Sequence, residues 1–141
     1  MKKLQTGRSM IEMLGVLAII GVLSIGGLAG YTMAMNRHRA NQILDYMSRC
    51  AIAAQTRGDG YEIVPGAATM PCTDLLPGQV PPNGISGTVA HANANAATFM
   101  ITSSAIASAD IRTALRDRSN TNVTITDCPN NENALNFVFQ K

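Results

Sequence analysis

The sequence predicts an α+β fold in which one long N-terminal helix packs, through its second half, on a small antiparallel β-sheet. An uncharged apolar run over residues 13–36 continues into a segment with helical periodicity, so a single helix is expected to about residue 57. From residue 87 onward, short segments alternate apolar and polar residues, which is typical of strands. A chain of 141 residues suits one small domain plus an N-terminal anchor.

Residues 8–35 are expected to form a transmembrane helix. At a rise of about 1.5 Å per residue, the uncharged run spans roughly 36 Å, which is enough to cross a bilayer core. Glu12 stands at the start of this run. Because a carboxylate is costly in hydrocarbon, such residues are usually paired and functional. An ordinary secretory signal has a shorter apolar core, and an ordinary anchor does not explain Glu12.

Residues 36–57 are predicted to continue the same helix with one apolar face. The residues that recur at helical spacing are Ala40, Ile43, Leu44, Met47, Cys50, Ala51 and Ala54. Asp45 and Arg49 form an i, i+4 pair on the polar side. Glycines at positions 58 and 60 indicate the helix end. Residues 58–86, rich in proline and glycine, are expected to be a loop with at most short elements.

Residues 87–141 are predicted to form the antiparallel sheet and a short helix. The strands at 87–91 and 98–102 pair across a turn at 93–95. Ser108 is the expected N-cap of the short helix, with Asp110 in its first turn. Two further strands, centred on Ile125 and Phe137, are expected to be antiparallel neighbours joined by a turn at 128–131.

Composition and motifs argue against several classes of function. The formal net charge is +2, and the two lysines of residues 1–7 account for it, so the remainder offers no electrostatic basis for direct nucleic-acid binding. His38 and His91 lie beside no nucleophile motif and are expected to be surface residues. No C-x-x-C spacing or calcium-loop pattern occurs, so neither metal nor cofactor is expected and the chain is predicted not to be an enzyme. The glycosylation sequon at Asn122 spans only three residues and is weak evidence for glycosylation.

The N-terminal order of Lys2, Lys3, Gly7, four residues, Glu12 and an apolar helix resembles the class III signal of type IV pilins. The resemblance implies that a prepilin peptidase removes residues 1–7 as a leader by cutting between Gly7 and Arg8. Glu12 then becomes the fifth residue of the mature chain, where the family carries a glutamate. Arg8 departs from the Phe, Met or Leu that usually begins the mature family chain and undergoes N-methylation.

The second half resembles type IVb pilins. The segments that carry this likeness are residues 83–89, residues 98–102 and residues 110–115. The resemblance implies the pilin fold, with residues 58–86 wrapping over the helix. It also implies a structural function, as the major subunit of a type IV pilus that serves cell adhesion, motility, conjugation or DNA uptake.

The same resemblance implies a set of partners and a location. The prepilin would reside in the inner membrane and then be polymerised, by an assembly platform and an assembly ATPase, into an extracellular pilus of identical copies. Glu12 would meet the N-terminal amine of a neighbouring subunit. The helix glycines Gly21, Gly26, Gly27 and Gly30 are expected to allow close helix packing or local stretching.

Two alternatives stay open. A minor pilin, or a pseudopilin of type II secretion, shares the same N-terminal signature. A membrane-anchored periplasmic binding or enzymatic domain forms no filament, and it predicts an intact N-terminus and indifference to substitution of Glu12.

Three cysteines leave one unpaired after export to an oxidising compartment. We predict a Cys72–Cys128 disulfide, because both residues lie beside loops or turns. Cys50 is then expected to remain a buried thiol on the apolar face of the helix. The alternative is a Cys50–Cys72 bond, which would fasten the loop to the helix.

Overall fold

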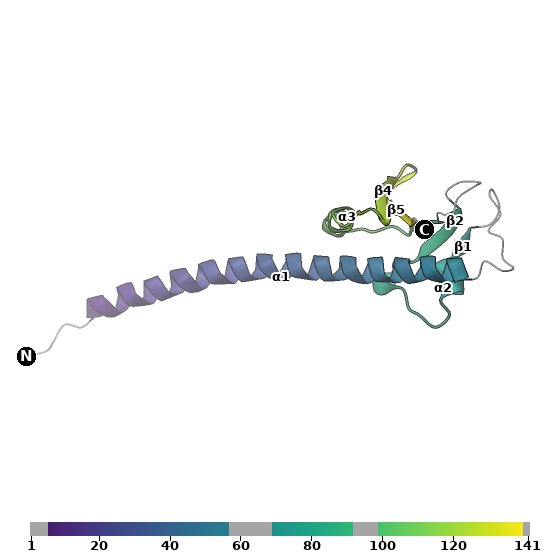
Figure 1. Cartoon of the computed structure of the whole chain (residues 1–141). Helices are drawn as coiled ribbons and strands as arrows, with labels where there is room; N and C mark the ends of the chain where they lie inside the picture. The colour runs from purple at the N-terminus through teal and green to yellow at the C-terminus, as the bar shows by residue number, and fades with distance from the viewer. Residues whose placement is uncertain (1–5, 57–68, 92–98, 140–141) are drawn as a thin grey trace, which may run out of the picture. The chain divides into compact units, whose positions relative to one another are not determined.

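The computed structural model describes residues 6–56, 69–91 and 99–139 (Figure 1). The chain is of the α+β class and divides between Met35 and Asn36 into two compact units, which we call unit 1 and unit 2. The elements, in order, are α1 (Thr6–Thr56), β1 (Met70–Pro71), α2 (Cys72–Leu75), the 3-10 turn η1 (Pro82–Gly84), β2 (Gly87–His91), β3 (Phe99–Ser103), α3 (Ala109–Arg116), β4 (Val123–Cys128) and β5 (Asn131–Phe139).

Helix α1 contains both predicted helical segments without a break. Its part in unit 1 carries apolar side chains in all directions, and they are exposed from Met10 to Met33. Within the described part of the chain, α1 is the one helix long and apolar enough to cross a membrane. This composition suits a membrane anchor or a signal sequence.

The five strands form one antiparallel sheet in the order β1-β2-β3-β5-β4. The predicted pairing of residues 87–91 with the next strand is confirmed, with Val89 opposite Ile101. The predicted pairing of the last two strands is also confirmed, with Ile125 opposite Phe137. Strand β5 additionally pairs with β3, so it lies inside the sheet and β4 forms an edge.

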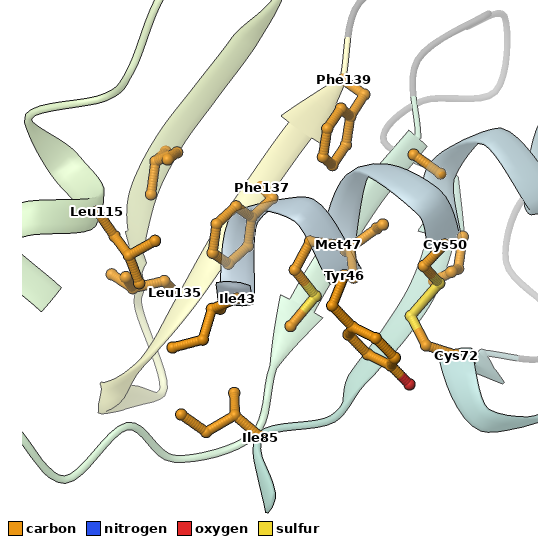
Figure 2. Packing of buried hydrophobic residues seen from close by; sticks show 14 of the residues in the cluster. Ile43, Tyr46, Met47, Cys50, Cys72, Ile85, Leu115, Leu135, Phe137 and Phe139 are labelled. Carbon is orange, nitrogen blue, oxygen red and sulfur yellow. A yellow bond between two sulfur atoms is a disulfide. The ribbon is translucent and has the colours of Figure 1, made fainter. Parts of the chain in front are cut away.

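The core of unit 2 lies between the sheet and the second half of α1. Ile43 and Met47 of α1 are fully buried in one apolar cluster with Phe137 of β5, and Figure 2 labels all three side chains. Leu115 of α3 belongs to the same apolar cluster. This burial follows the helical spacing of the apolar residues, because every third or fourth residue of a helix returns to the same face.

Several details refine the predicted elements. Ser108 occupies the N-cap position of α3, but its side chain makes no capping hydrogen bond. The segment predicted as a loop over 58–86 contains β1, α2 and η1, all short. The predicted helix stop at 58–60 and the predicted turn at 93–95 lie outside the described residues.

Candidate functional site

The disulfide joins Cys50 of α1 to Cys72 at the start of α2, with a Cα–Cα distance of 5.6 Å. The predicted Cys72–Cys128 bond is therefore wrong, and the alternative pairing is the one formed. Cys128 is a free, half-buried thiol at the end of β4.

The sheet order explains this pairing. Cys72 directly follows β1, at one edge of the sheet, whereas Cys128 ends β4, at the other edge. Adjacent strands lie about 4.8 Å apart, so the two edges are separated by roughly 19 Å. A disulfide requires Cα atoms closer than about 7 Å. Cys50 lies on the buried face of α1, one turn beyond Tyr46, and is within reach.

Gly87 provides the close approach that lets β2 pass over this region. A Cβ atom at Gly87 would lie 2.7 Å from Cγ2 of Ile101, 2.9 Å from Sδ of Met47 and 3.1 Å from Sγ of Cys72. Any side chain there would collide with the core and with the disulfide. The absence of a side chain at Gly87 is therefore a packing requirement of unit 2.

Tyr46 is buried beside the disulfide, with 4% of its surface exposed (Figure 2). Its hydroxyl finds no hydrogen-bond partner among the described residues. Burial raises the pKa of Tyr46 above its ordinary value, because the ionised form loses solvation. The aromatic ring fills the core, and the hydroxyl adds a desolvation cost to folding.

The residues of the predicted processing and assembly signal lie at the beginning of α1. Gly7 and Arg8 fall in its first turn, and their side chains lie outside the described residues. Glu12 is exposed and shares one flank of the helix with Met13, Val16 and Leu17. The role in assembly that the sequence predicts for Glu12 stays a prediction.

The helix glycines contrast with Gly87. At Gly21, Gly26, Gly27 and Gly30, an added Cβ would meet nothing within 4 Å. The part of the chain that the structure describes therefore does not require glycine at these positions. If these four glycines serve in packing, their packing partners are another chain or the membrane.

Unit 2 is further tied together at the end where α1 enters it. Nδ2 of Asn36 donates a 3.3 Å hydrogen bond to Oδ2 of Asp110, in the first turn of α3. His38 lies one turn from Gln42, and their side chains are in hydrogen-bond contact at 3.2 Å. The exposure of His38 agrees with the prediction that it is a surface residue.

The outer edge of β4 is partly occupied by the segment that precedes it. The backbone N–H of Asn120 donates to the carbonyl of Val123 at 2.8 Å. The N–H of Ile125 donates to the hydroxyl of Ser119 at 3.2 Å. Arg116 of α3 pairs with Asp127 at the same edge. These contacts shorten the stretch of unpaired backbone available for strand addition.

No group of three or more metal-ligating side chains occurs in the ranges that the structure describes. Comparison of the chain with protein-family models, with curated proteins and with solved structures finds no significant match.

Proposed function

We propose that this chain is a subunit of a type IV pilus, made as a prepilin and polymerised into a helical filament. The observation that carries the proposal is the first half of α1: an exposed apolar helix with Glu12 near its start, preceded by a basic leader and Gly7. The second half of the same helix packs in a folded unit. This arrangement supports a subunit that is held in a membrane and then transferred into a filament.

The proposed mechanism uses the apolar half of α1 twice. Before assembly it lies in the hydrocarbon of the inner membrane, and after assembly it lies among the same helices of other subunits. Both surroundings are apolar, so the transfer exposes little apolar surface to water. The four helix glycines leave open space on α1, which permits close approach between helices of neighbouring copies.

Glu12 sets the register in this proposal. Cleavage after Gly7 would create an α-amine at Arg8, four residues before Glu12. In the filament, the carboxylate of one subunit pairs with the amine of a neighbour. Such a pair contributes less to net stability than to the choice of register, because both charges lose their solvation.

Processing provides the first test. Intact mass of the exported chain should correspond to a start at Arg8, and a Gly7→Leu variant should remain uncut. A chain that still begins at Met1, or one cut after the apolar run, would contradict the pilin assignment.

Filament yield tests the role of Glu12. The Glu12→Ala variant should insert into the membrane at least as well as wild type, because the helix becomes more apolar, but should yield few or no sheared filaments. Glu132→Ala is the matched control, since it removes an exposed glutamate at the start of β5 and should leave assembly unchanged. Wild-type filament yield from Glu12→Ala as the sole copy would overturn the pairing.

A further inference from the structure

Asn83 lies in a tight turn with a left-handed backbone. Within the described ranges it is the one non-glycine residue with a positive φ, at 54°. Gly84 follows with a φ of 72°, and the N–H of Ile85 donates to the carbonyl of Pro82 at 3.0 Å. Positive φ at both central residues is the geometry of a type I′ turn, for which Asn-Gly is a preferred pair. The local sequence therefore explains this conformation.

Asn83-Gly84 is also the one Asn-Gly pair in the sequence. Asparagine before glycine is prone to deamidation, because glycine has no side chain to shield its backbone nitrogen. That nitrogen, once it loses its proton, attacks Cγ of the asparagine, and the side-chain amide takes up a proton and leaves as ammonia. Water then opens the cyclic imide at either carbonyl, which gives aspartate or isoaspartate. Both products carry a carboxylate in place of the amide.

The folded turn protects the attacking nitrogen. The N–H of Gly84 donates to the carbonyl of Pro81 at 3.2 Å, and this hydrogen bond opposes loss of the proton. The side chain of Asn83, which supplies the carbon that is attacked, is exposed to solvent. Deamidation at this position therefore depends on opening of the turn.

Opening of this turn exposes little buried surface. Residues 77–80 and 83–84 are exposed, and residues 81–82 are half-buried. The nearest buried side chains on the two sides are those of Leu75 and Ile85, which belong to the core cluster, and Figure 2 labels Ile85. Segments with few buried apolar contacts and exposed backbone hydrogen bonds open locally at a lower free energy than global unfolding requires. This turn is therefore expected to open while the core of unit 2 stays folded.

We propose that Asn83 is a deamidation site of the folded chain, and that local opening of the turn over residues 81–85 controls the rate. Deamidation at Asn83 is independent of the proposed function. Isoaspartate inserts one carbon atom into the main chain, so the turn no longer closes with the same hydrogen bonds. Because Ile85 is buried and Gly87 begins β2 two residues later, this change reaches the core of unit 2 and lowers its stability.

Peptide mapping of the full chain in detergent micelles, after incubation at mildly alkaline pH, measures aspartate and isoaspartate at Asn83. The rate in the folded chain is divided by the rate of the same chain in guanidinium chloride, which removes differences in intrinsic chemistry. We expect the folded rate to be at least about tenfold lower, which corresponds to about 1.4 kcal/mol for opening of the turn. Equal rates contradict protection by the turn, and a folded chain without product at Asn83 contradicts local opening.

Two core variants separate local opening from global unfolding. Leu115→Ala destabilises the core at α3, apart from Ile85 in Figure 2, and should change the ratio of rates by less than about twofold. Ile85→Ala also destabilises the core but releases the buried side chain next to the turn, and should raise the ratio at least about tenfold. A similar rise in both variants would show reaction through global unfolding and overturn the role of the turn.

The stability of the product tests the structural consequence. After chromatographic separation, the isoaspartate form should have a urea midpoint about 0.3–1 M below that of the Asn83→Asp variant. This variant is the matched control, because it carries the same charge without the added main-chain carbon. Equal midpoints for the two forms would contradict the effect of the longer main chain on the core.

Discussion

The two halves of the continuous helix α1 differ in the surroundings of their apolar side chains. In unit 1, Met13 is 67% exposed and apolar side chains point in every direction. In unit 2, Met47 is fully buried, and the apolar residues keep to one face. The apolar face of the second half is buried against the chain's own sheet. The apolar side chains of the first half have no such cover within the described residues. Identical residue types in the two halves should therefore respond differently to the same substitution.

Methionine gives the largest expected contrast. Met47→Ala should lower the free energy of unfolding of unit 2 by about 2–5 kcal/mol, because it leaves a cavity in a packed core. Met13→Ala should change it by less than about 0.5 kcal/mol. Urea unfolding of the full chain in detergent micelles, followed by tyrosine emission, measures both. Equal losses from the two variants would break the comparison.

The disulfide gives the next contrast, this time within unit 2. Replacing Cys50 and Cys72 by alanine opens a link between residues 22 positions apart. The expected cost is about 3 kcal/mol on the chain-entropy model. Cys128→Ala should leave stability nearly unchanged, because this thiol is not bonded to another cysteine. Peptide mapping without reductant should recover a bridged peptide containing Cys50, and one linking Cys128 to Cys72 would contradict the structure.

Glycine sharpens the comparison further. Gly87→Ala should destabilise unit 2 by about 1–3 kcal/mol, because the added methyl group collides with Ile101 and Met47. Gly26→Ala meets open space and should instead favour the helix by about 0.5–1 kcal/mol. Thermal unfolding monitored by circular dichroism compares the two variants. A destabilised Gly26→Ala variant would show that this glycine is needed within a single chain.

Tyrosine gives the smallest expected effect. Tyr46→Phe removes a buried hydroxyl that has no partner among the described residues, so stability should change by less than about 1 kcal/mol and in the favourable direction. Tyr31→Phe, at a residue 63% exposed, is the matched substitution in unit 1 and should leave unit 2 unchanged. Urea midpoints of the two variants at neutral pH measure this difference.

Tyr46 also predicts a dependence of stability on pH. Burial raises the pKa of Tyr46 above 10.0, so the folded state resists ionisation more than the unfolded state does. The free energy of unfolding is therefore unaffected by the titration of Tyr46 below about pH 10, and it falls as the pH rises through the folded pKa. Tyr46→Phe should remove this alkaline loss, and an unchanged alkaline profile would contradict the assignment to Tyr46.

Local sequence patterns were sufficient to predict much of the fold. The spacing of Ile43, Met47 and Ala54 predicted the buried face of α1, because periodicity is a property of neighbouring residues. Alternation around Ile125 and Phe137 predicted two paired strands for the same reason. The two-residue strand β1 is too short to produce a pattern, so the predicted loop over 58–86 did not include it.

The remaining features depend on contacts between distant parts of the chain. The disulfide prediction failed because it required the strand order, in which β5 separates β3 from β4 and leaves Cys128 at the far edge. The need for glycine at Gly87 arises from side chains of three other elements. The hydrogen bond from Asn36 to Asp110 joins residues 74 positions apart in the sequence. The role predicted for Glu12 stays a prediction, since it concerns a second copy of the chain.

The Cys50–Cys72 bond has a mechanical consequence. A chain pulled through α1 at one end and through the sheet at the other carries tension along its covalent bonds. At Cys50 the load passes directly through the disulfide to Cys72 and on toward β2, so the covalent path of the load bypasses residues 51–71. Reduction of the disulfide would place these residues in series with the load and lengthen the chain under the same force.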